Sequence, residues 1–130
     1  MAFHFNGYPD FVAKLAKPGE RILPNINPES CDLLHASLGI AGEAGEIVDA
    51  VKKHVIYGQP LNVENLKEEI GDLKFYLEQM MQIINTDDEE CQNLNIKKLL
   101  KRYPNGYSDA AAKERLDKVS DHSEHSERNE

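Results

Sequence analysis

Two short segments of the sequence repeat one pattern: IAGEAGEI, residues 40–47, and LKEEIGDL, residues 66–73. Each reads apolar-x-x-acid-apolar-Gly-acid-apolar without a gap, and each is followed four positions later by another apolar residue, Val51 or Leu77. Apolar residues at these intervals fall on one face of an α-helix. The repeat therefore predicts two helices that present the same arrangement of apolar and acidic side chains.

The rest of the chain predicts further helices and no strand. Apolar periodicity, bounded by cap and turn residues, predicts the following helices: 10–16, 30–56, 62–84, 87–102 and 108–119. Three prolines predict an extended connector over residues 17–29. Thr86 and Glu89 predict a capping box before the helix at 87–102. The fold class is therefore an all-α helical bundle, with two long antiparallel core helices and several shorter ones.

Length and composition predict one domain. A chain of 130 residues that is 40% hydrophobic can build a single core but is short for a large monomeric enzyme. We expect an all-α domain over residues 1–119, in which residues 1–29 form an N-terminal helix and a proline-rich connector. Residues 120–130 contain no apolar side chain and should form a disordered acidic tail. An oligomeric assembly is expected.

Charge and composition exclude several classes of function. A net charge of −8 argues against binding to a nucleic acid polymer, because such proteins neutralise phosphates with Lys and Arg. Cys31 and Cys91 lack metal-ligand spacing and are too few for a disulfide scaffold, so we interpret them as reduced thiols. The N-terminus has no signal-peptide pattern, and no apolar run is long enough to span a membrane. We expect a cytoplasmic protein.

Four acidic residues flank the two apolar stripes on the same side. Glu43 and Glu46 border the stripe of the first helix, while Glu69 and Asp72 border that of the second. Antiparallel packing through the stripes would bring the four carboxylates together, and their mutual repulsion would require cations. Oxygen ligands of this kind favour Mg²⁺ or Mn²⁺ rather than Zn²⁺. One such pair alone is common on a solvated helix face, whereas two pairs in register favour a metal site.

Three segments of the sequence resemble a known family. GEAGEIVDAVKK, residues 42–53, and LKEEIGDLKFYL, residues 66–77, resemble the signature of MazG-like all-α nucleoside triphosphate pyrophosphohydrolases, which is ExxE, a spacer and ExxD. The spacer between Glu46 and Glu69 has 22 residues. NIKKLLKRYPNGYS, residues 95–108, resembles the Asn-x-x-Lys-Leu-x-x-Arg-Tyr-Pro segment that follows in many members.

This resemblance implies a helical bundle, assembled as a homodimer or homotetramer. It implies hydrolysis of an NTP or dNTP to the monophosphate and pyrophosphate with Mg²⁺, or with Mn²⁺, in the clearing of nucleotide pools. Carried over, the metal ligands are Glu43, Glu46, Glu69 and Asp72. We interpret Glu46 and Glu69 as the catalytic carboxylates, with Glu46 as the base.

The resemblance also implies residues that bind the substrate. Asn95, Lys98, Arg102 and Tyr103 match the basic segment, and Lys98 and Arg102 share one helical face. The alternative is a basic helix end that the macrodipole favours. His35 lies on the side of the acids, with Gly39 and Gly42 between, so it could contact a nucleobase across space that the glycines keep open. The alternatives are a histidine packed at a helix interface and glycines that allow close packing.

Two other functions remain open. The same fold could serve as a non-catalytic helical interaction or regulatory protein. A related phosphoribosyl-ATP pyrophosphohydrolase would share the metal chemistry. Four acids gathered at one place, together with Lys98 and Arg102, favour the triphosphate hydrolase, since a binding module gains nothing from carboxylates that repel one another.

Overall fold

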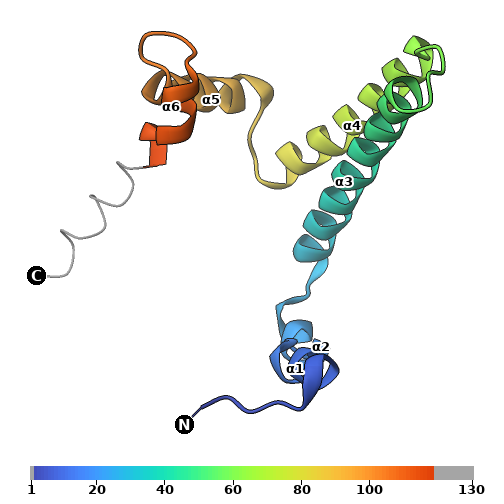
Figure 1. Cartoon of the computed structure of the whole chain (residues 1–130), viewed down its shortest axis with the longest axis vertical. Helices are drawn as coiled ribbons and strands as arrows, with labels where there is room; N and C mark the ends of the chain where they lie inside the picture. Colours follow the sequence, from blue (N-terminus) through green and yellow to red (C-terminus); the bar gives the residue numbers. More distant parts are fainter. Residues whose placement is uncertain (1, 119–130) are drawn as a thin grey trace, which may run out of the picture. The chain divides into compact units, whose positions relative to one another are not determined.

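The structure, a computed structural model, describes residues 2–118, and it is helical (Figure 1). Its elements, in chain order, are α1 (Gly7–Leu15), α2 (Gly19–Ile22), the 3₁₀ helix η1 (Leu23–Asn25), α3 (Pro28–Val55), α4 (Val63–Ile83), α5 (Asp88–Arg102) and α6 (Asp109–Glu114). The described residues form no strand, only an isolated bridge between Pro104 and Gly106. The all-α prediction is confirmed.

The chain divides into two compact units, residues 1–80 and residues 81–130. We describe each unit by itself. The prediction of a single domain over residues 1–119 stays a prediction, and the predicted tail at 120–130 lies outside the described residues. None of the helices within residues 2–118 combines the length and the apolar character needed to cross a bilayer.

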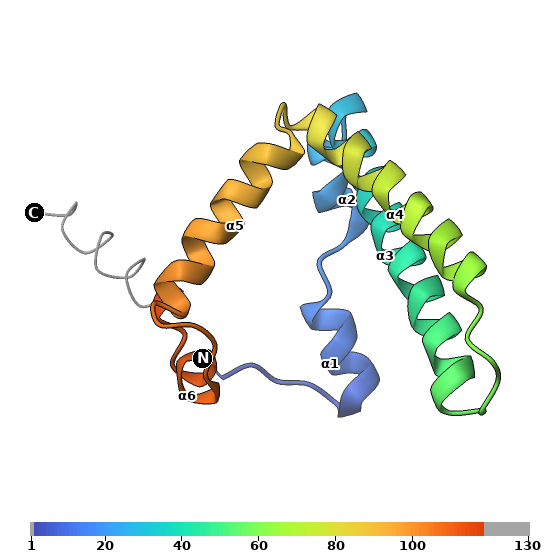
Figure 2. The ribbon, with the colours of Figure 1, turned by 90° about the horizontal axis from the view of Figure 1, so that it is seen from above.

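The first unit is built on a hairpin of two long helices. α3 and α4 run antiparallel and side by side in both views of the chain (Figures 1 and 2). Asn27 starts α3 with a capping box: its side chain accepts a hydrogen bond from the Ser30 amide, and the Ser30 hydroxyl accepts one from the Asn27 amide. After α3, Gly58 turns the chain at φ +66°, and the Asn62 side chain accepts from the Asn65 amide at the start of α4.

The predicted apolar stripes face each other only in part. Ile40 and Ile47 of α3, with Leu66 and Leu73 of α4, are half-buried. The other stripe positions, Ala44, Val51, Ile70 and Leu77, are exposed. Among the described residues Ala36 is the only buried hydrophobic residue. The hairpin therefore has a seam but not a complete core.

The segment before α3 differs from its prediction. Residues 17–29 were expected to be extended, yet they contain α2 and η1. Pro18 precedes α2, Pro24 lies in the first turn of η1 and Pro28 is the first residue of α3. Proline is tolerated at these positions because the first amides of a helix have no intrahelical partner. Three prolines therefore mark three helix starts.

The second unit contains α5 and α6. Asp87 caps α5, since its side chain accepts from the Glu90 amide, so the predicted capping box of Thr86 and Glu89 is wrong. Ser108 caps α6 as predicted, by accepting from the Ala111 amide. The left-handed conformation of Arg115 (φ +54°) ends α6 earlier than expected. A polar residue at the right spacing identifies a helix start, but several adjacent candidates compete for the role.

Candidate functional site

Three of the four predicted acids converge between α3 and α4. Glu43 comes from α3, and Glu69 and Asp72 come from α4, one turn apart. One carboxylate oxygen from each lies within 4.8 Å of the others. Glu43 and Glu69 are half-buried, and Asp72 is exposed. We call these three residues the acidic cluster.

The electrostatics of the cluster act most strongly on Glu69. Partial burial raises the pKa of the Glu69 carboxyl above its usual value, and the negative charges of Glu43, Glu46 and Asp72 raise it further. A side-chain hydrogen bond with Glu43 acts in the same direction. Carboxylates this close cannot all remain ionised without cost unless a cation lies between them.

Glu46 lies beside the acidic cluster but outside it. Its side chain is exposed, and its charge reaches Glu69. One turn later on α3, Asp49 forms an ion pair with Lys53 at 2.6 Å. That pair raises the pKa of Lys53 and lowers that of Asp49. Glu46, Asp49 and Lys53 border a cavity of about 170 Å³ between the end of α3 and the start of α4.

The opposite side of the cluster is occupied by an aromatic ring. Tyr76 of α4 lies so close to Gly39 that a β-carbon at this position would overlap its ring. The interpretation of Gly39 as open ligand space is therefore wrong, and this glycine permits close helix packing. His35 also contacts the Tyr76 ring, at 6.1 Å between centroids. Gly42 has open space beside it.

The predicted phosphate-binding residues belong to the second unit. Asn95 and Lys98 are exposed on α5. A shallow cavity of about 190 Å³ runs along this helix and is lined by these residues: Leu94, Lys97, Lys98, Lys101, Asp117 and Lys118. Four lysines at one cavity give this face of the unit a positive charge. Lys97 and Lys101 lie there with the predicted residue Lys98.

Arg102 is held by a partner that the sequence did not suggest. Its Nε and Nη2 each donate to a carboxylate oxygen of Asp117 at 2.7 Å, and the side chain of Asp117 is 1% exposed. The Arg102 guanidinium holds the pKa of Asp117 down, at about 2, and Asp117 raises the pKa of Arg102. The Tyr103 ring lies 5.8 Å from the Arg102 guanidinium carbon. Arg102 thus ties residues 116–118 to α5.

No local pattern pointed to Asp117. The pair spans 15 residues and depends on how the turn after α5 reverses the chain. From the sequence alone, an aspartate after α6 is expected to be exposed to solvent. Its burial follows only from the turn that brings it to Arg102. Gly106, at φ +86°, contributes to that turn.

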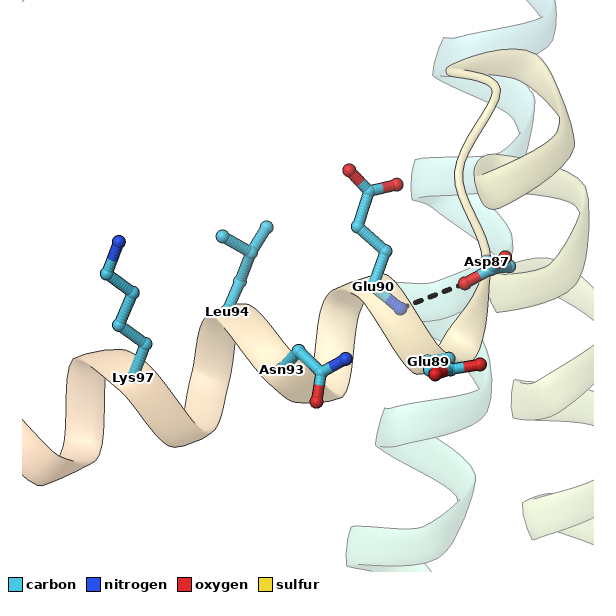
Figure 3. Close-up of a pocket in the computed structure, with 6 residues that line it drawn as sticks. All are labelled: Asp87, Glu89, Glu90, Asn93, Leu94 and Lys97. Atoms are coloured by element: carbon cyan, nitrogen blue, oxygen red, sulfur yellow. Dashed lines mark hydrogen bonds between the residues drawn. The ribbon is translucent and has the colours of Figure 1, made fainter.

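A second cavity on α5 contains none of the predicted site residues. It measures about 410 Å³ and is lined by Asp87, Glu89, Glu90, Asn93, Leu94 and Lys97. All six come from one helix and its cap, and the hydrogen bond from the Glu90 amide to Asp87 is the cap itself (Figure 3). Since no second element contributes to its lining, we interpret it as a helix surface rather than a ligand site.

Comparison with known proteins identifies one family. Residues 32–107, more than half of the chain, match the model of the MazG nucleotide pyrophosphohydrolase domain. The match includes the acidic cluster, Glu46 and the basic segment of α5. Comparisons with curated proteins and with solved structures returned no match. The chain belongs to the MazG nucleotide pyrophosphohydrolase domain family.

Proposed function

We propose that this protein is a Mg²⁺-dependent hydrolase that converts a nucleoside triphosphate, ribo or deoxy, to the monophosphate and pyrophosphate. Membership of the family supports nucleotide pyrophosphohydrolase activity in general. The clearing of nucleotide pools in the cytoplasm is part of the same proposal. The observation that carries it is the convergence of Glu43, Glu69 and Asp72 from two helices.

The donor set fits a hard divalent cation. All three groups of the cluster are carboxylates, and Mg²⁺ prefers oxygen ligands and is usually held by one or two carboxylates together with substrate phosphates. Partial burial and the neighbouring carboxylates raise the pKa of Glu69, and a cation at the cluster would oppose both effects. Glu43, Glu69 and Asp72 would hold the ion, with Glu46 beside them. When bound, Mg²⁺ polarises phosphoryl oxygens and lowers the pKa of a bound water.

Glu46 is suited to the role of base. It stands next to the cluster without being part of it, and its exposed carboxylate can accept a proton from the attacking water. The water oxygen forms a bond to the α-phosphorus, and the bond from that phosphorus to the bridging oxygen of the β-phosphate breaks. Pyrophosphate leaves with the electron pair, and the nucleoside monophosphate remains.

A second part of the proposal concerns the basic segment of α5, whose positive charge suits the phosphates of a triphosphate. The proposal assigns phosphate contacts to Asn95, Lys98, Arg102 and Tyr103. Lys98 is exposed and can approach a phosphate directly. Nε and Nη2 of Arg102 each donate one hydrogen bond to Asp117, so the two N–H groups of Nη1 and the second N–H of Nη2 remain for a phosphate. The contact of His35 with a nucleobase stays a prediction.

The test is a product assay. The purified protein is incubated with Mg²⁺ or Mn²⁺ and with a panel of NTPs and dNTPs, and pyrophosphate and orthophosphate are measured separately. We expect pyrophosphate and a nucleoside monophosphate in equal amounts, and no product after chelation with EDTA. Orthophosphate as the primary product, or no product from any triphosphate, would contradict the proposal. The second result would favour the interaction-protein alternative.

We also propose that the protein is an oligomer whose copies meet along α3. Near the end of this helix, apolar side chains surround a cavity of about 410 Å³; they are the half-buried Ile47 and the exposed Val48, Val51, Val55 and Ile56, with Lys52. Val48 is 65% exposed and Val55 is 67% exposed. The hairpin lacks a complete core, and contiguous apolar surface of this kind marks an interface. A second copy with the same face would cover it symmetrically.

Val51→Glu should separate the oligomer. A charge at this position would be buried against apolar groups of the other copy, which is costly. Light scattering should give the wild type a mass of at least twice the 14.7 kDa of one chain and the variant the mass of one chain. Val63→Glu, at the exposed first residue of α4, is the matched control and should keep the wild-type mass. A monomeric wild type would contradict the proposed oligomer.

A further inference from the structure

We propose that the cavity beside Glu46 is the nucleobase subsite and that it takes a pyrimidine. This inference rests on the proposed function, because it names the class of triphosphate that the acidic cluster would act on. The cavity lies wholly within the first unit, between α3 and α4. It lies beyond the acidic residues, toward the connector between α3 and α4, residues 56–62.

The position of the cavity suits the base of a nucleotide whose phosphates lie at the acidic cluster. On α3, Glu46 borders both the cluster and the cavity, and Ala50 and Lys53 follow one and two turns later. On α4, Asn65 lines the cavity one turn before Glu69. A helix rises about 1.5 Å per residue, so the cavity extends roughly 10 Å from Glu46 to Lys53. This length is in the range that a nucleoside requires beyond its α-phosphate.

Toward the other end of the line of acidic residues, an aromatic ring lies between the two helices. There the Tyr76 ring packs against Gly39 and contacts His35. A nucleotide that placed its base at that end, as the predicted contact with His35 requires, would have to displace this ring, so the cavity proposed here replaces that contact. The cavity at the connector is already formed.

The size of the cavity favours a single ring. A protein cavity of about 150 Å³ holds one benzene molecule. The volume here is about 170 Å³, and pockets for whole drug-sized ligands begin near 300 Å³. A pyrimidine fits this volume, whereas a purine, with two fused rings, exceeds it. Pro60 and Ala50 supply apolar surface for the faces of the ring.

The polar lining can recognise the edge of a base. Three side-chain amides, those of Gln59, Asn62 and Asn65, border the cavity. An amide carries both donors and an acceptor, as do the hydrogen-bonding edges of cytosine and uracil. The side-chain oxygen of Asn62 caps α4, so its NH₂ group is the part that remains to bind a base. Asn65 is half-buried, and within residues 2–118 its side-chain amide has no hydrogen-bond partner.

The charges in the cavity argue against a phosphate there. Glu46 and Asp49 are both acidic, and the one cation in the lining, Lys53, is already paired with Asp49 at 2.6 Å. A neutral base avoids this repulsion, and the phosphates stay with the cluster. Charge therefore sets the direction in which the nucleotide lies.

The test compares kcat/KM among triphosphates and measures the effect of removing the Asn65 amide. The full chain with Mg²⁺ is assayed for kcat/KM on CTP, UTP, ATP and GTP, and the deoxy forms are assayed in parallel. We expect at least one pyrimidine triphosphate to exceed both purines by about tenfold or more. Asn65→Ala should lower kcat/KM for that pyrimidine about tenfold and leave the value for ATP within about twofold. Gln92→Ala, which removes an exposed amide on α5, is the matched control and should change neither value.

The outcomes separate this inference from the proposed function. Hydrolysis without a pyrimidine preference, or a preference that Asn65→Ala leaves intact, would overturn the base subsite and leave the hydrolase standing. If no triphosphate is hydrolysed, calorimetric titration with CMP and AMP in Mg²⁺ decides the subsite alone. CMP binding that Asn65→Ala weakens supports the inference, and equal or absent binding of both nucleotides overturns it.

Discussion

Replacing Glu69 with glutamine should reduce pyrophosphate release about a thousandfold. The substitution keeps the size of the side chain but removes the charge at the centre of the acidic cluster. Metal ions contribute several kcal/mol to the stabilisation of such transition states, and each 1.36 kcal/mol corresponds to a factor of ten in rate. The measurement is kcat/KM for the best triphosphate at saturating Mg²⁺, with pyrophosphate as the readout.

The neighbouring residue provides the control. Glu68→Gln makes the same chemical change one position earlier on α4, at an exposed residue outside the acidic cluster. Its activity should stay within about twofold of wild type, as surface substitutions usually have small effects. Equal activity of the Glu69→Gln variant and the wild type would remove the cluster from the reaction.

A stability measurement tests the same cluster without catalysis. The pKa of Glu69 is raised in the folded state, so its ionisation destabilises the fold, and stability is lost as pH rises above the usual glutamate range. At pH 7 without divalent ions, Glu69→Gln should therefore melt no lower than wild type. The proposed Mg²⁺ site exists only in the folded protein, so Mg²⁺ should raise the Tm of the wild type more than that of the variant.

Replacing Asp117 with asparagine should lower the Tm of the second unit by about 10 °C. The carboxylate is buried and makes both of its short hydrogen bonds with Arg102, and the variant leaves the guanidinium without its charged partner. Arg102→Lys should lose most of the same stability, because a lysine cannot make the bidentate contact. Thermal unfolding followed by circular dichroism gives both values. Glu114→Gln, at an exposed residue of α6, is the control and should melt within about 1 °C of wild type.

The pH dependence has a definite sign. The pKa of Asp117 is about 2 in the folded protein and 3.8 ordinarily, so the stability that the pair contributes is fully present above pH 4. It is lost as the pH falls through about 2. Wild type should show this loss, and Asp117→Asn should not. If Arg102 acted only on phosphate, the variant would keep its Tm and would change only the KM of the triphosphate.

The sequence by itself determined most of the helical architecture. The repeat at residues 40–47 and 66–73 has the period of an α-helix, and this period can be recognised from the local sequence alone. The end of α3 and the start of α4 follow from Gly58 and Asn62, respectively, whose roles are local. The same repeat was sufficient to place the acids on one side of each helix. Two helix starts were predicted wrongly. The cap of α5 is Asp87 rather than Thr86, because neighbouring polar residues compete as caps. Residues 17–29 contain α2 and η1 because proline fits the first turn of a helix.

Tertiary structure decided which of those residues meet. Glu43, Glu69 and Asp72 converge while Glu46 stands aside, because the relative rotation of two packed helices is set by contacts such as Tyr76 on Gly39. The pairing of Arg102 with Asp117 depends on a chain reversal across 15 residues. The cavity at Asn65 exists only between α3, the connector and α4. Periodicity fixes the face of a helix on which a side chain lies, whereas its neighbours depend on packing that no local pattern encodes.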